Sequence, residues 1–176
     1  HRAPGTRIED GRYPVVTGLE HDESGHPSGD AVNHIAMTKK RRNKLKTLAD
    51  TLPTPEVCGA DSGDVLLVGW GSTKGPLLEA VEQLSNEGYT LSSLHIKHIN
   101  PLPTGLEDIL PRFKSVYIVE MNDGGVYGYG QLAGVLRARY ADARIKGINK
   151  TAARRWKVSE IIERVKARLE EEAAAA

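Results

Sequence analysis

From residue 64 onward the apolar residues alternate between two regular patterns. The run Asp64–Trp70 is almost continuously apolar, which is typical of a strand buried on both faces of a parallel sheet. Apolar residues then recur at helical spacing from Leu77, and Gly88 stands where a helix should end. Further strands are predicted at 91–99, 115–120 and 144–148, with helices at 104–110 (capped by Thr104), 132–140 and 158–169. This β-α-β-α-β-α-β-α order indicates an open sheet with helices on both faces.

The N-terminal part follows a different pattern. Tyr13–Gly18 is a short strand candidate, and a loop rich in charge and glycine follows it. A long basic helix is predicted from Asp30 to Pro53, with a linker from Pro53 to Gly63. We therefore expect an N-terminal strand and loop at 1–30, a basic helix and linker at 31–63 and an α/β core at 64–176, within one compact domain.

Charge and cysteine content exclude several classes of protein. The 24 basic and 23 acidic residues give a net charge of +1, so nucleic acid and membrane surfaces are not expected partners. The single cysteine, Cys58, excludes an internal disulfide and a metal site of clustered thiolates. No apolar run approaches the length of a bilayer span, and a cytoplasmic protein is predicted. Since His1–Thr6 resembles the middle of a loop, we interpret the start as a cut in a longer polypeptide.

Ligands of open α/β sheets bind beyond the carboxyl ends of the strands, which directs attention to the loops there. Gly71, Ser72 and Thr73 follow the first core strand and could bind an anion at a helix N-terminus. A tight turn in which Ser72 or Thr73 caps the helix is the favoured alternative. Asn122, Gly130 and Gln131 frame a glycine-rich loop. They could present an amide pair to a subunit or ligand, or belong to a flexible connection, and both interpretations stay open.

The most polar cluster precedes the basic helix. It consists of Glu20, His21, Asp22, Glu23 and Gly25, with His34 later in the chain. Carboxylates and imidazoles can form a metal or acid–base site, but this spacing matches no standard ligand motif. An interface or loop-ordering role is favoured over catalysis, and no metal site or catalytic residue is assigned to the chain.

A resemblance to a known family covers almost the whole chain. The most specific string is Thr17-Gly18-Leu19-Glu20-His21-Asp22-Glu23-Ser24-Gly25, and the other strings add weight by occurring in the expected order. They are Pro27-Ser28, His34, Met37, Lys40-Arg41, Lys44-Leu45, 69–73, 99–103, 119–122, 129–132, 148–151 and 156–158. The chain resembles the alpha subunits of 2-oxoacid:ferredoxin oxidoreductases, especially the 2-oxoglutarate type, and Arg2 and Pro4-Gly5-Thr6 resemble the family's interdomain loop.

The resemblance implies a three-layer α/β/α fold similar to the transketolase C-terminal domain, with an open sheet of about five mostly parallel strands. The family converts a 2-oxoacid such as 2-oxoglutarate or pyruvate and coenzyme A into an acyl-CoA, carbon dioxide and reduced ferredoxin. Thiamine diphosphate, Mg²⁺, iron–sulfur clusters and coenzyme A are implied for the full complex, and none for this fragment. The implied partners are the remaining alpha-subunit domains, the beta subunit and ferredoxin.

These observations favour a structural, subunit-organising C-terminal domain that is inactive when isolated. The alternative is a stand-alone phosphate- or nucleotide-binding module that uses the helix N-terminus after Gly71. A flavin-dependent electron carrier is disfavoured because aromatic residues make up only 5% of the chain.

Overall fold

The computed structural model describes residue 3, residues 5–7 and residues 15–175. Its contacts divide the chain into two compact units, His1–Leu48 and Ala49–Ala176. Helix α1 (Ala31–Thr51) contributes most of its length to the first unit. The division predicted from sequence, into 1–30, 31–63 and 64–176, stays a prediction.

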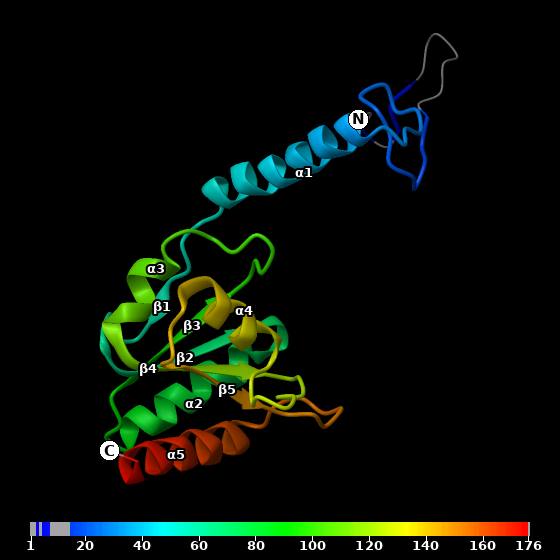
Figure 1. Ribbon diagram of the computed structural model, residues 1–176. Coiled ribbons are helices and arrows are strands. Elements are labelled where there is room, and N and C mark those ends of the chain that lie inside the picture. The colour runs from blue at the N-terminus through cyan, green and yellow to red at the C-terminus, as the bar shows by residue number, and fades with distance from the viewer. Residues whose placement is uncertain (1–2, 4, 8–14, 176) are drawn as a thin grey trace. The chain divides into compact units, whose positions relative to one another are not determined.

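The second unit is built on a five-stranded sheet, counted over the residues that the structure describes (Figure 1). Its strands are β1 (Val57–Cys58), β2 (Gly63–Trp70), β3 (Leu91–Ile96), β4 (Phe113–Glu120) and β5 (Ile145–Asn149). They lie in the order β1-β3-β2-β4-β5, with β1 antiparallel to β3 and the other neighbours parallel. The predicted open, mostly parallel sheet is confirmed.

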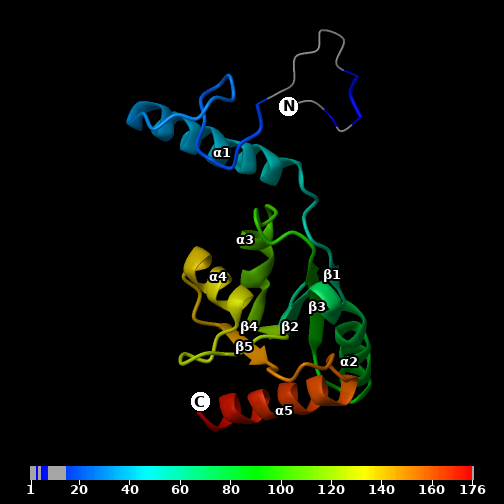
Figure 2. The ribbon, with the colours of Figure 1, turned by 90° about the vertical axis from the view of Figure 1, so that its right-hand side faces the viewer.

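Helices cover both faces of this sheet (Figure 2). The α-helices of the unit are α2 (Lys74–Asn86), α3 (Leu106–Ile109), α4 (Gln131–Tyr140) and α5 (Val158–Ala174), with 3-10 turns at Gly71–Thr73 and Leu110–Arg112. Helices α3 and α4 lie on one face, and α2 and α5 lie on the other. The three layers and the alternating order of strands and helices agree with the prediction.

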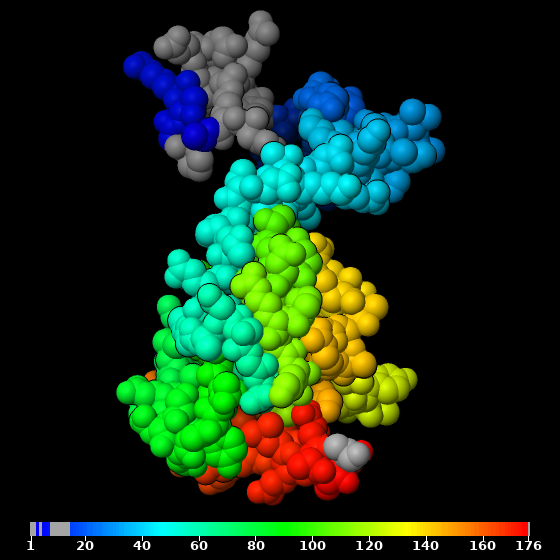
Figure 3. Space-filling model, turned by 90° about the vertical axis from the view of Figure 1, so that its left-hand side faces the viewer, coloured from blue at the N-terminus to red at the C-terminus, as the bar shows by residue number. Residues whose placement is uncertain are grey.

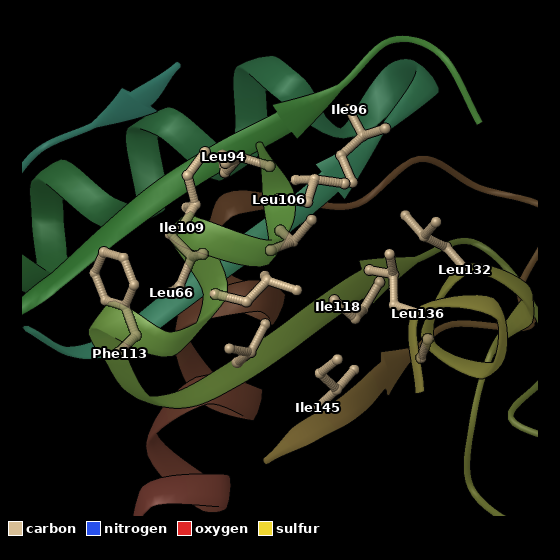
Figure 4. Packing of buried hydrophobic residues seen from close by; sticks show 14 of the residues in the cluster. Leu66, Leu94, Ile96, Leu106, Ile109, Phe113, Ile118, Leu132, Leu136 and Ile145 are labelled. Carbon is tan, nitrogen blue, oxygen red and sulfur yellow. The ribbon is translucent and has the colours of Figure 1, made fainter. Parts of the chain in front are cut away.

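The central strand β2 divides the core into two apolar clusters. Leu66 and Val68 face α3 and α4, whereas Val65 and Leu67 face α2 and α5, because successive side chains of a strand point to opposite faces. Figure 4 shows the first cluster, in which Leu66 packs among residues of α3, α4 and the neighbouring strands. Burial on both faces explains why β2 is almost continuously apolar in sequence.

The end of α2 confirms the role predicted for Gly88. Its φ of 95° lies in the left-handed region, which glycine adopts without the penalty of a side chain. The Gly88 amide donates to the Ser85 carbonyl at 3.0 Å, and the Tyr89 amide donates to the Leu84 carbonyl at 3.1 Å. Together these bonds form a Schellman cap that ends the helix and turns the chain toward β3.

The N-terminal strand prediction is wrong for the residues that can be assessed. Val15–Gly18 form no strand, and Val16 is 88% exposed, so its apolar side chain has no sheet to pack against. Tyr13 and Pro14, and Arg2 and Pro4 of the predicted junction loop, lie outside the described residues. The correction to the strand prediction thus applies to Val15–Gly18.

Three boundaries in the core also differ from prediction. The Pro53–Gly63 linker supplies the edge strand β1, where Val57 pairs with Leu94. Strand β3 ends at Ile96 rather than at residue 99, because Ile96 pairs with Trp70, the last residue of β2. Helix α3 begins after Gly105, whose φ is 92°, and Thr104 does not cap it.

Candidate functional site

The carboxyl ends of β2 and β4 form the switch point of the sheet. Beyond β2 the chain enters α2 on one face, and beyond the adjacent β4 it enters α4 on the opposite face. The two connections diverge there, which in open α/β sheets creates the usual ligand crevice. Trp70, Glu120 and the loop from Met121 to Gly130 lie at this point of the sheet.

The carboxylate of Glu120 lies at this switch point and is fully buried. Its oxygens accept hydrogen bonds from Trp70 Nε1 at 3.3 Å and Asn122 Nδ2 at 2.7 Å. They also accept bonds from the backbone amides of Leu132 and Ala133, each at 2.9 Å. Those two amides belong to the first turn of α4, where a negative charge is favoured by the helix dipole. The carboxylate thus ties β2, β4 and α4 together.

Sequence reasoning missed Glu120 because it ends an otherwise apolar strand like any other boundary residue. An acidic residue at the end of a buried parallel strand, followed ten residues later by Gly130 and a helix, is the signal that could have found it. The structure does place two of the predicted residues beside it: Asn122 donates to it and Gly130 packs against it. Gln131, the first residue of α4, is exposed.

Gly130, the residue before α4, permits β4 and β5 to lie close to the start of that helix. A Cβ atom there would come within 3.0 Å of Glu120 Oε1 and of Asn149 Nδ2. The φ of Gly130 is −72°, so space rather than backbone conformation requires glycine at this position. The predicted part that Asn122, Gly130 and Gln131 play toward a subunit or ligand stays a prediction.

The hydroxyl groups of the Gly71–Thr73 turn contact other residues of the same unit. The buried Thr73 hydroxyl donates to the Trp70 carbonyl at 2.9 Å, and the exposed Ser72 hydroxyl lies 3.8 Å from Met121 Sδ. Neither side chain caps α2, so the predicted capping is wrong. The reason is that a 3-10 turn precedes α2 and directs Thr73 back toward the strand. Anion binding at these residues remains untested.

In the first unit, Glu20 joins the polar loop to helix α1. Its two oxygens accept hydrogen bonds from Arg41 Nη1 and Nη2, both at 2.9 Å, in a bidentate pair. His34 Nδ1 lies 2.8 Å from Glu20 Oε2. The hydrogen bonds from Arg41, and secondly the contact with His34, lower the pKa of Glu20 from 4.5 to about 2. The cluster therefore holds a carboxylate that stays ionised at neutral pH.

The neighbouring residues order the same loop. Asp22 Oδ1 accepts bonds from the Ser24 amide at 2.8 Å and the His26 amide at 3.1 Å, which closes a tight turn. The turn requires Gly25, whose φ is 94°. Glu23 pairs with Lys40 at 2.6 Å, and the His21 carbonyl accepts a bond from Asn33 Nδ2 at 3.1 Å. These contacts agree with a loop-ordering role, while an interface role for the cluster stays a prediction.

Acid should release the Glu20 contacts in a window set by the shifted pKa. A depressed carboxyl pKa contributes stability above pH 4.5, and this contribution is lost as the pH falls from about 4.5 to about 2. An NMR titration should give a Glu20 carboxyl midpoint near 2. In Arg41→Met the midpoint should return toward 4.5, whereas Arg42→Met, the adjacent arginine, should leave it low. A parent midpoint near 4.5 would contradict the paired geometry.

The described residues hold neither a metal-ligand cluster nor a helix suited to a membrane span. No group of three or more His, Cys, Asp and Glu residues among them is arranged to hold a metal ion. No helix in the described part of the chain is both long and apolar enough to cross a membrane.

Comparison with known proteins places the chain in a family. No family model matches the sequence. The alpha subunit of 2-oxoacid:ferredoxin oxidoreductase 2 from Aeropyrum pernix is 34% identical over 174 residues, which cover 90% of this chain and 26% of that protein. The 2-oxoglutarate oxidoreductase subunit KorA of Mycobacterium tuberculosis is 33% identical over 152 residues, covering 77% of this chain and 22% of that protein. The chain belongs to the alpha-subunit family of the 2-oxoacid:ferredoxin oxidoreductases.

A solved structure supports the same relationship for the fold. The 2-oxoglutarate:ferredoxin oxidoreductase of Magnetococcus marinus, with 2-oxoglutarate, coenzyme A and succinyl-CoA bound, aligns with a TM-score of 0.76 at 30% identity. The alignment covers 94% of this chain and 28% of the Magnetococcus chain. The chain thus spans about a quarter of the length of the relatives it matches.

Proposed function

We propose that this chain is a structural and subunit-organising domain of the alpha subunit of a 2-oxoacid:ferredoxin oxidoreductase. The observation that carries the proposal is the match of 90% of the chain to only 26% of an alpha subunit. The proposed parent reaction releases carbon dioxide from a 2-oxoacid, transfers the acyl group to the thiol of coenzyme A and passes two electrons to ferredoxin. The proposed substrate is 2-oxoglutarate, on the basis of the KorA and Magnetococcus relatives.

The hydrogen bonds that Glu120 accepts at the end of β4 support a structural role for the chain. A thiamine-diphosphate enzyme needs oxygen ligands for Mg²⁺ and a carboxylate that faces the cofactor ring. Glu120, at the switch point of the sheet, already accepts bonds from four N–H donors of this chain and therefore does not fit either task. We propose that thiamine diphosphate, Mg²⁺, the iron–sulfur cluster and the coenzyme A site belong to other parts of a cytoplasmic complex.

The partners in this proposal are the remaining alpha-subunit domains and the beta subunit, with ferredoxin as electron acceptor. The glycine-rich loop offers one surface for such contacts, because Val126 is 95% exposed and Tyr127 is 83% exposed. Adjacent exposed apolar side chains can form part of a protein–protein contact, and these two residues are neighbours in the chain. The Glu20–Gly25 loop, which α1 holds in a fixed form, is a second proposed contact.

Reconstitution tests this proposal. The purified chain, supplied with 2-oxoglutarate, coenzyme A, thiamine diphosphate, Mg²⁺ and ferredoxin, should reduce no ferredoxin. Adding the remaining alpha-subunit domains and the beta subunit of the same enzyme should give a complex that co-elutes with the chain and reduces ferredoxin. Turnover by the chain alone would refute the structural role, and failure to co-elute would refute the organising role.

A matched pair of variants separates assembly from folding. Replacing both Val126 and Tyr127 by serine should weaken co-elution while leaving the unfolding midpoint of the isolated chain unchanged, because both side chains are exposed. Replacing Leu78, which is 37% exposed on α2, by serine serves as the control and should leave co-elution intact. If both variants co-elute as the parent does, the glycine-rich loop is not a subunit contact.

A further inference from the structure

A pocket of about 210 Å³ lies at the β1 edge of the sheet, and neither Trp70 nor Glu120 lines it. Its lining includes Cys58 of β1, Ser93 and His95 of β3, and the first turn of α2. The segment from Pro53 to Glu56 and the residues after β3 complete it. Figure 3 shows the chain around residues 53–58, in cyan, running along the outside of the core. All of these residues belong to the second unit.

Two side chains that line the pocket carry buried polar atoms without partners in the described part of the chain. Ser93 and His95 point to the same face of β3, toward α2, because side chains alternate along a strand. Ser93 is 1% exposed, and neither its hydroxyl nor His95 Nδ1 has a hydrogen-bond partner among the residues that the structure describes. Buried polar atoms in folded proteins are nearly always bonded to protein, water or a ligand. Ser93 thus contributes to the pocket a hydroxyl group that has no hydrogen-bond acceptor among the described residues.

The charge around the pocket is mainly positive. Lys74 and Lys97 line it, together with His98, against a single carboxylate from Glu56, within a lining that falls wholly in the described segment 53–103. Burial, followed by the charges of Lys74 and Lys97, lowers the pKa of His95. The positive charges of Lys74 and Lys97 therefore reach His95, a residue that lines the pocket.

We propose that this pocket binds a phosphate-class oxyanion, held by the Ser93 hydroxyl and by the ammonium groups of Lys74 and Lys97. Phosphate oxygens accept from a hydroxyl and pair with lysine as a point charge, which matches the donors present. Lys74 also opens α2, where the helix dipole favours a negative charge. The residues differ from Gly71–Thr73, whose turn is engaged elsewhere, and the inference does not depend on the proposed role in an oxidoreductase.

The chain contains one cysteine, and its place in this pocket provides a specific probe. Alkylation of exposed Cys58 by iodoacetamide, a neutral reagent, can be followed by mass spectrometry on the whole chain. Inorganic phosphate should slow the reaction in a saturable way, whereas potassium chloride at equal ionic strength should not. Adenosine monophosphate, tested in parallel, distinguishes the source: protection at lower concentration than phosphate indicates a phosphorylated metabolite, and weaker protection indicates free phosphate.

Variants then assign the donors. Lys74→Met and Lys97→Met should each raise the phosphate concentration for half-protection about tenfold, since a charged hydrogen bond is lost. Lys114→Met, which removes an exposed lysine paired with Asp64, is the control and should match the parent. Ser93→Ala should also weaken protection, yet raise the thermal midpoint without phosphate, because it removes a buried hydroxyl that lacks a partner.

Absence of saturable protection by either phosphate compound would overturn the proposal. So would equal protection in the parent, Lys74→Met and Lys97→Met, because the anion would then bind outside the pocket. If Ser93→Ala lowered the thermal midpoint instead of raising it, the hydroxyl would already have a structural partner and would not be available to a ligand.

Discussion

Replacing Glu120 by alanine is expected to lower the free energy of unfolding of the second unit, Ala49–Ala176 (the core unit), by about 4 kcal/mol. The reason is the loss of one buried carboxylate that four N–H donors share, from Trp70, Asn122, Leu132 and Ala133. Each donor left without an acceptor in a buried position costs about 1–3 kcal/mol, reduced where water can enter the space. Urea unfolding followed by tryptophan fluorescence measures the change, because both tryptophans, Trp70 and Trp156, lie in the core unit.

Two further variants define what the Glu120 measurement means. Glu79→Ala removes an exposed carboxylate of α2 and should change the unfolding free energy by less than about 0.5 kcal/mol. Glu120→Gln keeps one carbonyl oxygen but directs an amide group at the N–H donors, so an intermediate loss is expected. A loss in Glu120→Ala no greater than in Glu79→Ala would show that the carboxylate does not hold β4 to α4.

The predictable part of the fold is the part whose pattern is local. The continuous apolar run of β2 indicates a strand buried on two faces, and Gly88 indicates a helix end. Both features could be predicted because the residues that indicate them are neighbours in the sequence. Strand β1 could not, because a two-residue strand between Pro55 and Gly59 has the composition of a linker. It becomes a strand only because β3 offers an unpaired edge to Val57 and Cys58.

Sites in this chain were predictable only where their residues are close in sequence. The Glu20–Gly25 loop was found as a polar string, although its pairing with Arg41 required the structure. The phosphate pocket was not found, since it combines residues of β1, α2 and β3 that no spacing rule connects. Glu120 lies between these cases: its four donors include Asn122, two residues later, and Trp70, fifty residues earlier. Tertiary partners rather than neighbours decide which polar residue is buried and bonded.

Replacing Gly130 by alanine should destabilise the core unit by about 3 kcal/mol, at the upper end of the usual cost of overpacking. The added Cβ would overlap Glu120 Oε1 and Asn149 Nδ2, which belong to two different strands and cannot both retreat. Gly134→Ala is the matched control, because it adds the same methyl group one turn later in α4, where nothing lies within 4 Å. It should stabilise the protein by about 0.5–1 kcal/mol through helix propensity. Urea unfolding should therefore move the midpoints of the two variants in opposite directions, and a shift of the same sign in both would contradict the close approach of β4, β5 and α4 at Gly130.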